Sequence, residues 1–571
     1  MSNKKTNTGN PLKTNSKKQL PPKVYKVLLA LTLVLTLIVF SNSLNNDFIV
    51  NWDDDSYILN NSTIQQFNKE SIKEIFTTFY GGNYHPLTTL VYALEFKWFN
   101  LNPKSYHLIN LLFHLFNVLL VFFFIKELTK KNIAAIITCV LFAIHPMHVE
   151  SVAWISELKD VLYTFFFLLS MLFYIRFSHK NNFTLYFMSL MLYTLSLLSK
   201  SAAVVLPILL ILIDYLQNKK IGIRNLLLKL PFFLLSVLFG IIALKSQGAQ
   251  AQLLTPDYSL LNSFFVASYA LSFYIFKFFI PLQLSAFYPH PIVNGSTLPL
   301  IYYLSPLLIA VFAFITYRVV KHRKTVLFGF IFLIVTLALI LQFFPVGGAI
   351  VAERYTYVPY IGLAFILAIY FENIYAKLKN KQILLISVST VAIVLFSVLS
   401  FNRTKVWANG ITLFDDVIEK NPKAFYAYHS RGVAYFYAGN YTASLNDYNK
   451  AIELNNNYGL TFYNRGLTQM MLKNYTDAQT SFNRTIELIP THDQAYNDRG
   501  IAAYNLGLLE DAIKDYSRSI ELNPNNARAH YNRGVTNYRL NEMEKACYDL
   551  RIASQLGSKE ALDMFGKYCK Q

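Results

Sequence analysis

The chain has 571 residues, of which 54% are hydrophobic and only 15% are charged, a composition that excludes a large soluble enzyme. Its formal net charge of +19 would suit a nucleic-acid-binding protein, but much of the excess lies in short clusters beside apolar segments. Such clusters are typical of the cytoplasmic loops of membrane proteins. We therefore predict a polytopic membrane protein and no nucleic-acid partner.

The N-terminal segment 1–23 is rich in Lys, Asn, Thr and Pro and contains no acidic residue. This composition predicts a disordered cytoplasmic tail. The apolar run 24–40 has the hydrophobicity of a signal peptide, but no small-residue cleavage site follows it. We therefore expect a retained first membrane helix.

A domain over residues 24–402 contains eleven predicted spans, since a membrane helix needs about 20 mostly apolar residues. They lie near 24–42, 107–126, 133–146, 160–176, 183–198, 202–216, 226–245, 300–317, 325–344, 356–375 and 383–401. A further apolar segment, 261–280, carries Ser, Tyr and Lys residues. Counting it as a span would separate the basic run 318–324 from the other basic clusters, so we predict a re-entrant or interfacial helix there.

An acidic triplet, Asp53, Asp54 and Asp55, follows the first span, in a long predicted non-cytoplasmic loop over 43–106. Three neighbouring carboxylates at the mouth of a membrane helix repel one another and cannot enter hydrocarbon without a large cost. Either the loop solvates them or a functional site uses them. The amphipathic stretch 64–80 is predicted to lie on the membrane surface beside them.

Further unusual polar residues lie in the predicted loops and helix ends on the same side of the membrane. The segment 145–150, HPMHVE, could bind a metal, bind a substrate or cap a helix at the interface. Because Pro146 interrupts its spacing and HExxH is absent, a metal is not predicted, although a divalent ion is left open. Lys200 and Arg354 could snorkel, form an ion pair or hold a phosphate.

Taken together, these residue types suit transfer from a lipid-phosphate sugar. The phosphate of such a donor needs cationic partners, and its lipid tail needs a groove between helices. The acceptor hydroxyl needs a general base, which an aspartate supplies. We therefore expect a site at the non-cytoplasmic membrane boundary.

Beyond residue 402 the composition changes, and Arg-Gly pairs recur every 34 residues, beginning at Arg431, Arg465, Arg499 and Arg533. A period of about 34 residues with paired amphipathic helices is typical of tetratricopeptide repeats. The segment 403–571 is therefore predicted to form an α-solenoid with about four repeats over 421–558, flanked by capping helices. Cys547 and Cys569 could form a disulfide, but their spacing does not require it.

Several motifs occur in the order found in the transmembrane and tetratricopeptide repeat-containing protein family, which this chain resembles. They are Trp52-Asp53-Asp54, His85-Pro86-Leu87-Thr88, the segment 142–152, Leu198-Ser199-Lys200 and Glu353-Arg354-Tyr355. The resemblance implies a C-type glycosyltransferase similar to protein O-mannosyltransferases, with an acidic catalytic residue in the first non-cytoplasmic loop. Asp53 and Asp54 match that position. The chain departs from the family at Ser201, where the family often has Glu.

The resulting hypothesis is an all-α bacterial enzyme, a polytopic helix bundle followed by a solenoid. It would transfer mannose or another hexose from a polyprenyl-phosphate carrier, its co-substrate, to a protein hydroxyl on the periplasmic side of the inner membrane. Asp53 or Asp54 would be the base, and the repeats would bind a protein acceptor or partner on their concave face. The residues expected to bind substrate or phosphate are His85, His145, His148, Glu150, Lys159, Lys200 and Arg354.

Two alternatives remain open at this point. A degenerate transferase domain could anchor the repeats as a non-enzymatic scaffold for protein–protein interaction, and Ser201 is the argument for that. The chain could also process lipid-linked glycans, as a flippase or a polymerase-like transferase with a glycan acceptor.

Overall fold

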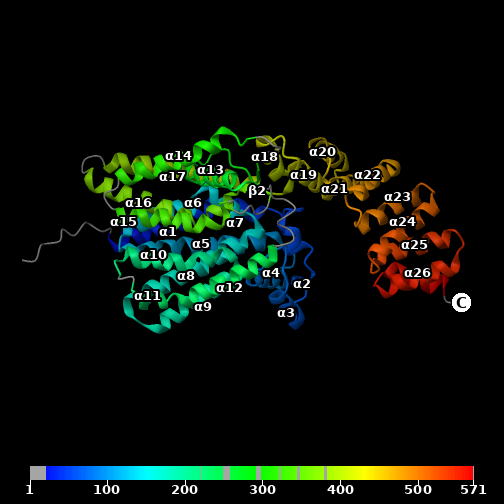
Figure 1. Cartoon of the computed structure of the whole chain (residues 1–571), viewed down its shortest axis with the longest axis horizontal. Coiled ribbons are helices and arrows are strands. Elements are labelled where there is room, and N and C mark those ends of the chain that lie inside the picture. Colours follow the sequence, from blue (N-terminus) through cyan, green and yellow to red (C-terminus); the bar gives the residue numbers. More distant parts are fainter. Residues whose placement is uncertain are drawn as a thin grey trace, which may run out of the picture. The chain divides into compact units, whose positions relative to one another are not determined.

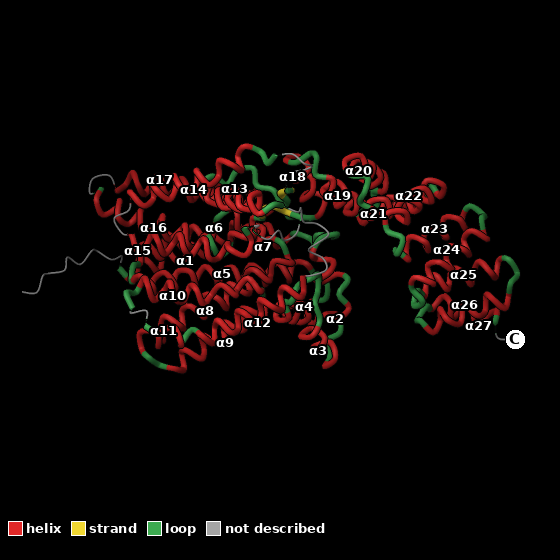
Figure 2. Tube along the Cα trace, viewed as in Figure 1, coloured by secondary structure: helices red, strands yellow, loops and turns green. Residues whose placement is uncertain are grey.

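The computed structural model describes residues 21–219, 222–247, 258–290, 297–319, 323–341, 343, 348–378 and 382–569. Nearly all of the predicted tail 1–23 lies outside these residues. The chain forms two compact helical units (Figures 1 and 2). We call them the membrane unit, Met1–Asp47 with Ser56–Trp407, and the repeat unit, Phe48–Asp55 with Ala408–Gln571.

Within the described residues, six helices of the membrane unit are long and apolar enough to cross a bilayer. They contain α1 (Pro22–Phe40), α5 (Pro103–Thr129), α8 (Leu158–Lys180), α12 (Leu230–Gln247), α13 (Leu260–Phe279) and α17 (Gln382–Val406). A seventh candidate is bent by 57° between α6 and the segment Pro146–Ala153. The other predicted spans lie on helices that fall short of this length or apolarity, namely α9 (Phe183–Ser199), α10 (Leu206–Leu216), α14 (Leu300–Val319), α15 (Arg323–Leu337) and α16 (Tyr360–Lys377). Each of the eleven predicted spans therefore lies on a helix.

The helix α13, over the segment predicted to be re-entrant or interfacial, is long and apolar enough to cross a bilayer. Phe265 packs on Tyr303, the Ser272 hydroxyl donates to the Ser305 carbonyl at 3.2 Å, and Phe279 packs on Phe312. Because the residue numbers of these contacts rise along both helices together, α13 and α14 run in the same direction. α13 therefore lies alongside α14 over much of its length, and its re-entrant or interfacial placement stays a prediction.

Short elements connect the long helices. The loop after α1 forms α2 (Ser62–Gln65), α3 (Lys69–Thr77) and α4 (Pro86–Phe99), so the stretch 64–80 is not one continuous helix. α6 (Asn132–Ile144) is followed by α7 (Val149–Ala153). The strands β1 (Tyr288–Pro289) and β2 (Ala349–Val351) pair antiparallel.

The repeat unit is a stack of helix pairs. Its helices are α18 (Gly410–Lys420), α19 (Phe425–Tyr437), α20 (Tyr441–Leu454), α21 (Gly459–Met471), α22 (Tyr475–Leu488), α23 (Asp493–Asn505), α24 (Leu509–Leu522), α25 (Ala527–Arg539), α26 (Met543–Gln555) and α27 (Lys559–Tyr568). A disulfide joins Cys547 of α26 to Cys569, with Cα atoms 5.6 Å apart. This pairing is one that the sequence left open.

The Arg-Gly period has a physical cause in this stack. Arg499 donates to Asp515, 16 residues later, and to Asn483, 16 residues earlier. Each arginine of the series makes the same two connections, to partners 16 residues away on either side. Each therefore ties its own repeat to the preceding element. The glycine beside it lets the paired helices approach closely, since a Cβ on Gly500 would lie 2.7 Å from the Tyr516 ring.

We predict that Gly500→Ala destabilises the repeat unit by about 1–3 kcal/mol, because the added methyl overpacks against Tyr516. The measurement is the temperature at which the repeat unit of the full chain becomes sensitive to protease. Gly566→Ala is the matched control, since a Cβ there meets no atom within 4 Å. Equal effects of the two substitutions would contradict this explanation.

Candidate functional site

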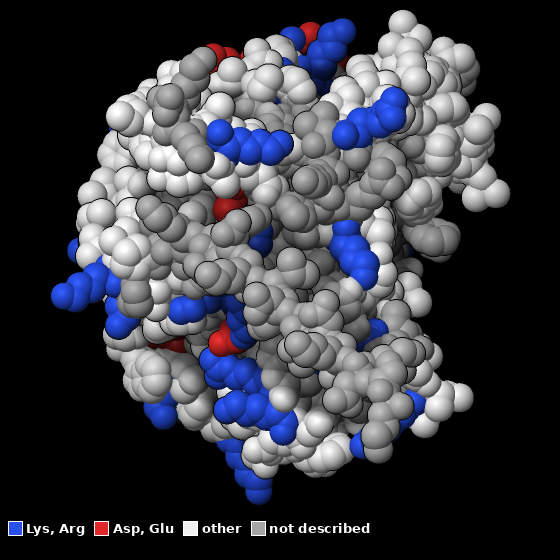
Figure 3. All heavy atoms as spheres, turned by 90° about the vertical axis from the view of Figure 1, so that its left-hand side faces the viewer, with Lys and Arg blue, Asp and Glu red and all other residues white. Residues whose placement is uncertain are grey.

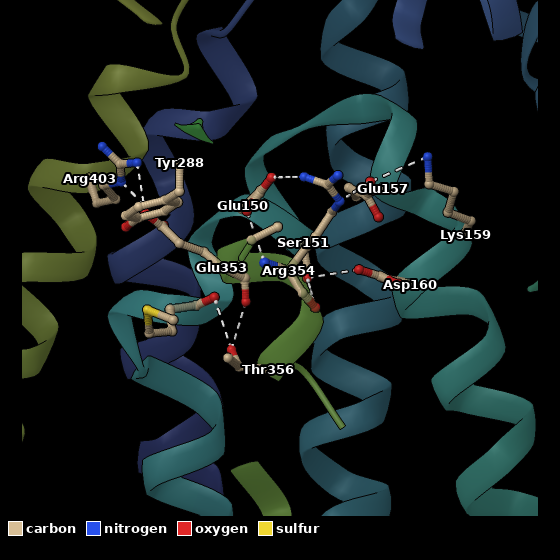
Figure 4. A network of polar contacts seen from close by, with 12 residues as sticks. Glu150, Ser151, Glu157, Lys159, Asp160, Tyr288, Glu353, Arg354, Thr356 and Arg403 are labelled. Carbon is tan, nitrogen blue, oxygen red and sulfur yellow. Dashed lines mark hydrogen bonds and ion pairs between the residues drawn. The ribbon is translucent and has the colours of Figure 1, made fainter. Parts of the chain in front are cut away.

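A cluster of three carboxylates and three cations lies in the membrane unit. Figure 4 labels all of its members except Lys200. The side chains come from α7, from the start of α8, from the turn after α9 and from the turn before α16. Its members are Glu150, Glu157, Lys159, Asp160, Lys200 and Arg354. Four of the six, Glu150, Lys159, Lys200 and Arg354, are residues that the sequence predicted for the site.

Arg354 bridges two of the carboxylates. Its guanidinium forms an ion pair with Glu150, and its backbone N–H donates to the second carboxylate oxygen at 2.9 Å. Its Nε lies 3.4 Å from Glu157 Oε1, and its guanidinium lies over the Trp154 ring at 5.5 Å. These four contacts hold the turn before α16 against α7.

Glu157 is the centre of the cluster, because all three cations approach it. Lys159 Nζ lies 3.3 Å from Oε1, and Lys200 Nζ lies 3.6 Å from Oε2. Lys200 also pairs with Asp160, whose other oxygen accepts a hydrogen bond from the Ser151 hydroxyl at 3.1 Å. The Glu157 side chain is fully buried. Burial of such a charge is tolerable only where cations and hydrogen bonds compensate for the lost water.

The local sequence explains how the cluster forms. Pro146 follows α6 and cannot continue its hydrogen bonding, so the chain bends by 57° and resumes as α7. A second break at Trp154 ends α7 and starts a new turn that carries Glu157. The Thr88 hydroxyl donates to the Ser199 carbonyl at 2.9 Å, which fixes α4 beside the turn that presents Lys200.

Two predicted residues, His145 and His148, have partners outside the cluster. His145 Nε2 donates to the Phe278 carbonyl at 3.1 Å, while its Nδ1 accepts from the Met147 N–H. His148 Nδ1 donates to the Phe142 carbonyl at 2.8 Å. The rings pack among Phe and Tyr side chains. In this structure the two histidines therefore join backbone segments and contact aromatic rings.

His85, a further predicted residue, occupies the N-cap position of α4 without a capping hydrogen bond from its side chain, and it is only 7% exposed. Burial, and then the charges of Lys159 and Lys200, hold its pKa well below the ordinary value, so the ring is neutral. Its Nδ1 has no hydrogen-bond partner in the described part of the chain. His85 Nδ1 is therefore a buried ring nitrogen near Lys159 and Lys200 that can accept a hydrogen bond.

The acidic triplet belongs to the repeat unit, which the sequence did not predict. Trp52 stacks on Phe414 of α18 with ring centroids 5.3 Å apart. Asp54 accepts the Ile49 N–H at 2.8 Å, and Asp55 accepts the Asn51 N–H at 2.6 Å. Burial raises the pKa of Asp55 above its ordinary value, against the opposing effect of that bond. At least two of the three carboxylates therefore shape their own turn.

A second ion pair lies beside the cluster and was missed by sequence reasoning. Arg403, near the end of α17, places Nη2 3.0 Å from Glu353 Oε1 (Figure 4). The Tyr288 hydroxyl donates to the same oxygen at 3.3 Å. This pair connects α17 and the β1 segment to the residue that precedes Arg354. Glu353 stands in one of the family motifs, whereas the only sequence signal for Arg403 was an arginine near the end of a predicted span.

Metal ligation has no support from these positions. Among the described residues, no group of three or more His, Cys, Asp or Glu side chains is arranged to hold a metal ion. The segment 145–150 does not converge on one point, because His145 and His148 bond to backbone groups and Glu150 pairs with Arg354.

Residues 85–246 match the family model described as dolichyl-phosphate-mannose-protein mannosyltransferase. Residues 432–473 and 504–541 match the model of the tetratricopeptide repeat, which agrees with the solenoid. The first match includes His85 and every member of the cluster except Arg354.

The chain is 26% identical over 417 residues to a protein O-mannosyl-transferase of Caenorhabditis elegans, covering 69% of this chain and 58% of that protein. It is 31% identical over 164 residues to protein O-mannosyl-transferase TMTC3 of Homo sapiens, covering 27% and 17%. Among solved structures, MamA is similar at 20% identity with a TM-score of 0.26, covering 26% of this chain and 88% of that one. The matched regions thus span little more than half of the first relative's length, and less of the second's.

We predict that Glu157→Gln destabilises the membrane unit by about 3–5 kcal/mol, because three cations would lose their shared buried counter-charge. The measurement is thermal unfolding of the purified full chain. Glu487→Gln, which removes an exposed pair with Arg484, should change stability by at most about 1 kcal/mol. Unaltered stability of the Glu157 variant would contradict the central place of that residue.

Proposed function

We propose that the chain, which is similar to protein O-mannosyl-transferases, is a membrane glycosyltransferase. It would move mannose or another hexose from a polyprenyl-phosphate carrier to a protein hydroxyl. The observation that carries this proposal is the buried carboxylate–cation cluster, most of which lies in the segment that matches the mannosyltransferase model. A helix bundle that only anchors other domains has no need of four buried and two half-buried charges at one place.

In this proposal Arg354 and Lys200 hold the donor phosphate. Their side chains are 18% and 17% exposed, whereas Glu150 and Glu157 are fully buried behind them. The carboxylates fix the two cations in place, which lowers the cost of ordering them when a phosphate binds. As the phosphate leaves the sugar, negative charge grows on it, and fixed cations stabilise that charge. Lys159, only 8% exposed, pairs with Glu157 and would help to keep that carboxylate in place beside the two cations.

The proposed base is Asp53 or Asp54, on the strength of the family resemblance. Asp54 already accepts the Ile49 N–H, and such a bond makes a carboxylate less basic. In this proposal one of the two carboxylates takes the proton from the acceptor hydroxyl. His85 is proposed to accept a hydrogen bond from the sugar or the acceptor at its Nδ1. His145 and His148 would act by holding the segment that carries Glu150.

The site is proposed to face the non-cytoplasmic side of the inner membrane. One face of the molecule carries many Lys and Arg residues and few Asp and Glu residues, as a cytoplasmic face does (Figure 3). The Cys547–Cys569 disulfide suits an oxidising compartment for the repeat unit. The solenoid would there bind the acceptor or another protein partner on its concave face.

A scaffold without activity is the second candidate, and one observation favours it. The cluster has three carboxylates for three cations, so it can be explained as a purely structural network. In that case the repeats alone would carry the function. Transfer to a glycan acceptor is a variant of the first candidate and needs the same donor site.

We predict that the double variant Asp53→Asn with Asp54→Asn loses at least about 100-fold of its transfer rate, since general base catalysis contributes at least that much. The assay follows labelled hexose from a synthetic polyprenyl-phosphate donor to protein. Asp47→Asn, at an exposed position in the same loop, is the matched control. Full activity of the double variant would overturn the assignment of the base.

We also predict that alkaline phosphatase fused after Gln571 is active in cells, whereas a cytoplasmic reporter at that position is inactive. This follows from an odd number of spans with the N-terminus inside. Cys547 and Cys569 should resist thiol labelling until a reductant is added. Activity of the cytoplasmic reporter would mean that the repeat unit lies inside the cell.

A further inference from the structure

The membrane unit contains an apolar cavity of about 370 Å³ that the proposed reaction does not use. It lies among α10, α13, α14 and α15. Large apolar side chains form its walls, including Leu271, Ile275, Phe312, Phe330 and Leu333. Its two polar lining residues are Tyr215 and Lys324.

The cavity exists because the surrounding helices pack in two separate groups. α14 packs along α13, while α15 packs against α16 and α10, and α14 and α15 barely touch. Two glycines draw α15 to α16, since a Cβ on Gly362 would lie 2.5 Å from the Gly329 carbonyl oxygen. Only residues without a side chain allow helices to approach this closely. The gap between α14 and α15 is therefore built into the fold.

The walls indicate what occupies the gap. Leu327 and Ile334, which line it, are 44% and 45% exposed, so the cavity opens sideways towards the surrounding lipid. Water would find almost no hydrogen-bond partner along these walls. A hydrocarbon chain fills such a space without losing any polar contact.

The end of the cavity at Lys324, near the start of α15, carries positive charge. Lys324 is exposed, with Nζ 2.5 Å from Asn218 Oδ1 and 5.4 Å from the centre of the Tyr215 ring. Arg318, also exposed, lies in the last turn of α14, the helix that forms another wall, and its guanidinium lies over the Phe314 ring. No carboxylate is among the described residues that line the cavity. The basic end matches an anionic headgroup.

We propose that this cavity binds an acyl chain of an anionic phospholipid, whose phosphate lies against Lys324 and Arg318. A sugar donor fits less well, because Lys200, which precedes α10, and Asn218, which follows it, lie at opposite ends of that helix. A donor held at Lys200 would leave the basic end of the cavity without its anion. This inference does not rest on the proposed transferase activity.

The test is native mass spectrometry of the purified full chain with equal amounts of phosphatidylglycerol and phosphatidylcholine of identical chains. We expect one phosphatidylglycerol to be retained in preference to phosphatidylcholine. Lys324→Gln should weaken its binding by about fivefold, the effect of one basic residue at a membrane surface. Ala313→Phe, which fills the cavity, should abolish binding of this lipid.

Matched controls separate these effects from general damage. Val311→Phe adds a large side chain to α14 at an exposed position outside the cavity and should leave binding unchanged. Lys377→Gln removes a cation at the end of α16, outside the cavity, and should also have no effect. Equal retention of both lipids, unchanged binding in Ala313→Phe, or retention of a polyprenyl phosphate in its place would each overturn the proposal.

Discussion

The ion pairs around Glu157 are the constraint on which the membrane unit depends. A fully buried carboxylate is stable only with close counter-charges, and here the cations come from three separate segments. Lys159 comes from α8, Lys200 from the turn after α9 and Arg354 from the turn before α16. One side chain thus links distant parts of the sequence, since Glu157 and Arg354 are 197 residues apart.

The same contacts explain why a stable bundle could also be a reactive one. The carboxylates lie deepest and the cations are partly exposed in front of them, so the cations are ordered before any substrate arrives. Preorganised charge is more effective in catalysis than charge that must be assembled during the reaction. Stability and the proposed recognition of phosphate would therefore both follow from one arrangement.

The helices of the fold were largely predictable from the sequence, because long apolar runs and a 34-residue period each have one simple physical cause. The side-chain partners were less so. Glu150, Lys159, Lys200 and Arg354 are conspicuous as polar residues at apolar helix ends, but nothing in the sequence indicates that Glu157 is their centre. That depends on the bends at Pro146 and Trp154. Likewise, Trp52 stacks on Phe414, and only the folded chain shows that the acidic triplet belongs to the repeat unit.

The measurement that tests the central claim most directly compares the sugar-modified proteins and the lipid-linked sugars of cells with and without this chain. If the chain is the transferase, its loss removes hexose from Ser or Thr residues of specific proteins while the charged polyprenyl-phosphate carrier accumulates. An unchanged set of modified proteins and carriers, together with the loss of a protein assembly, would contradict the account and favour the scaffold.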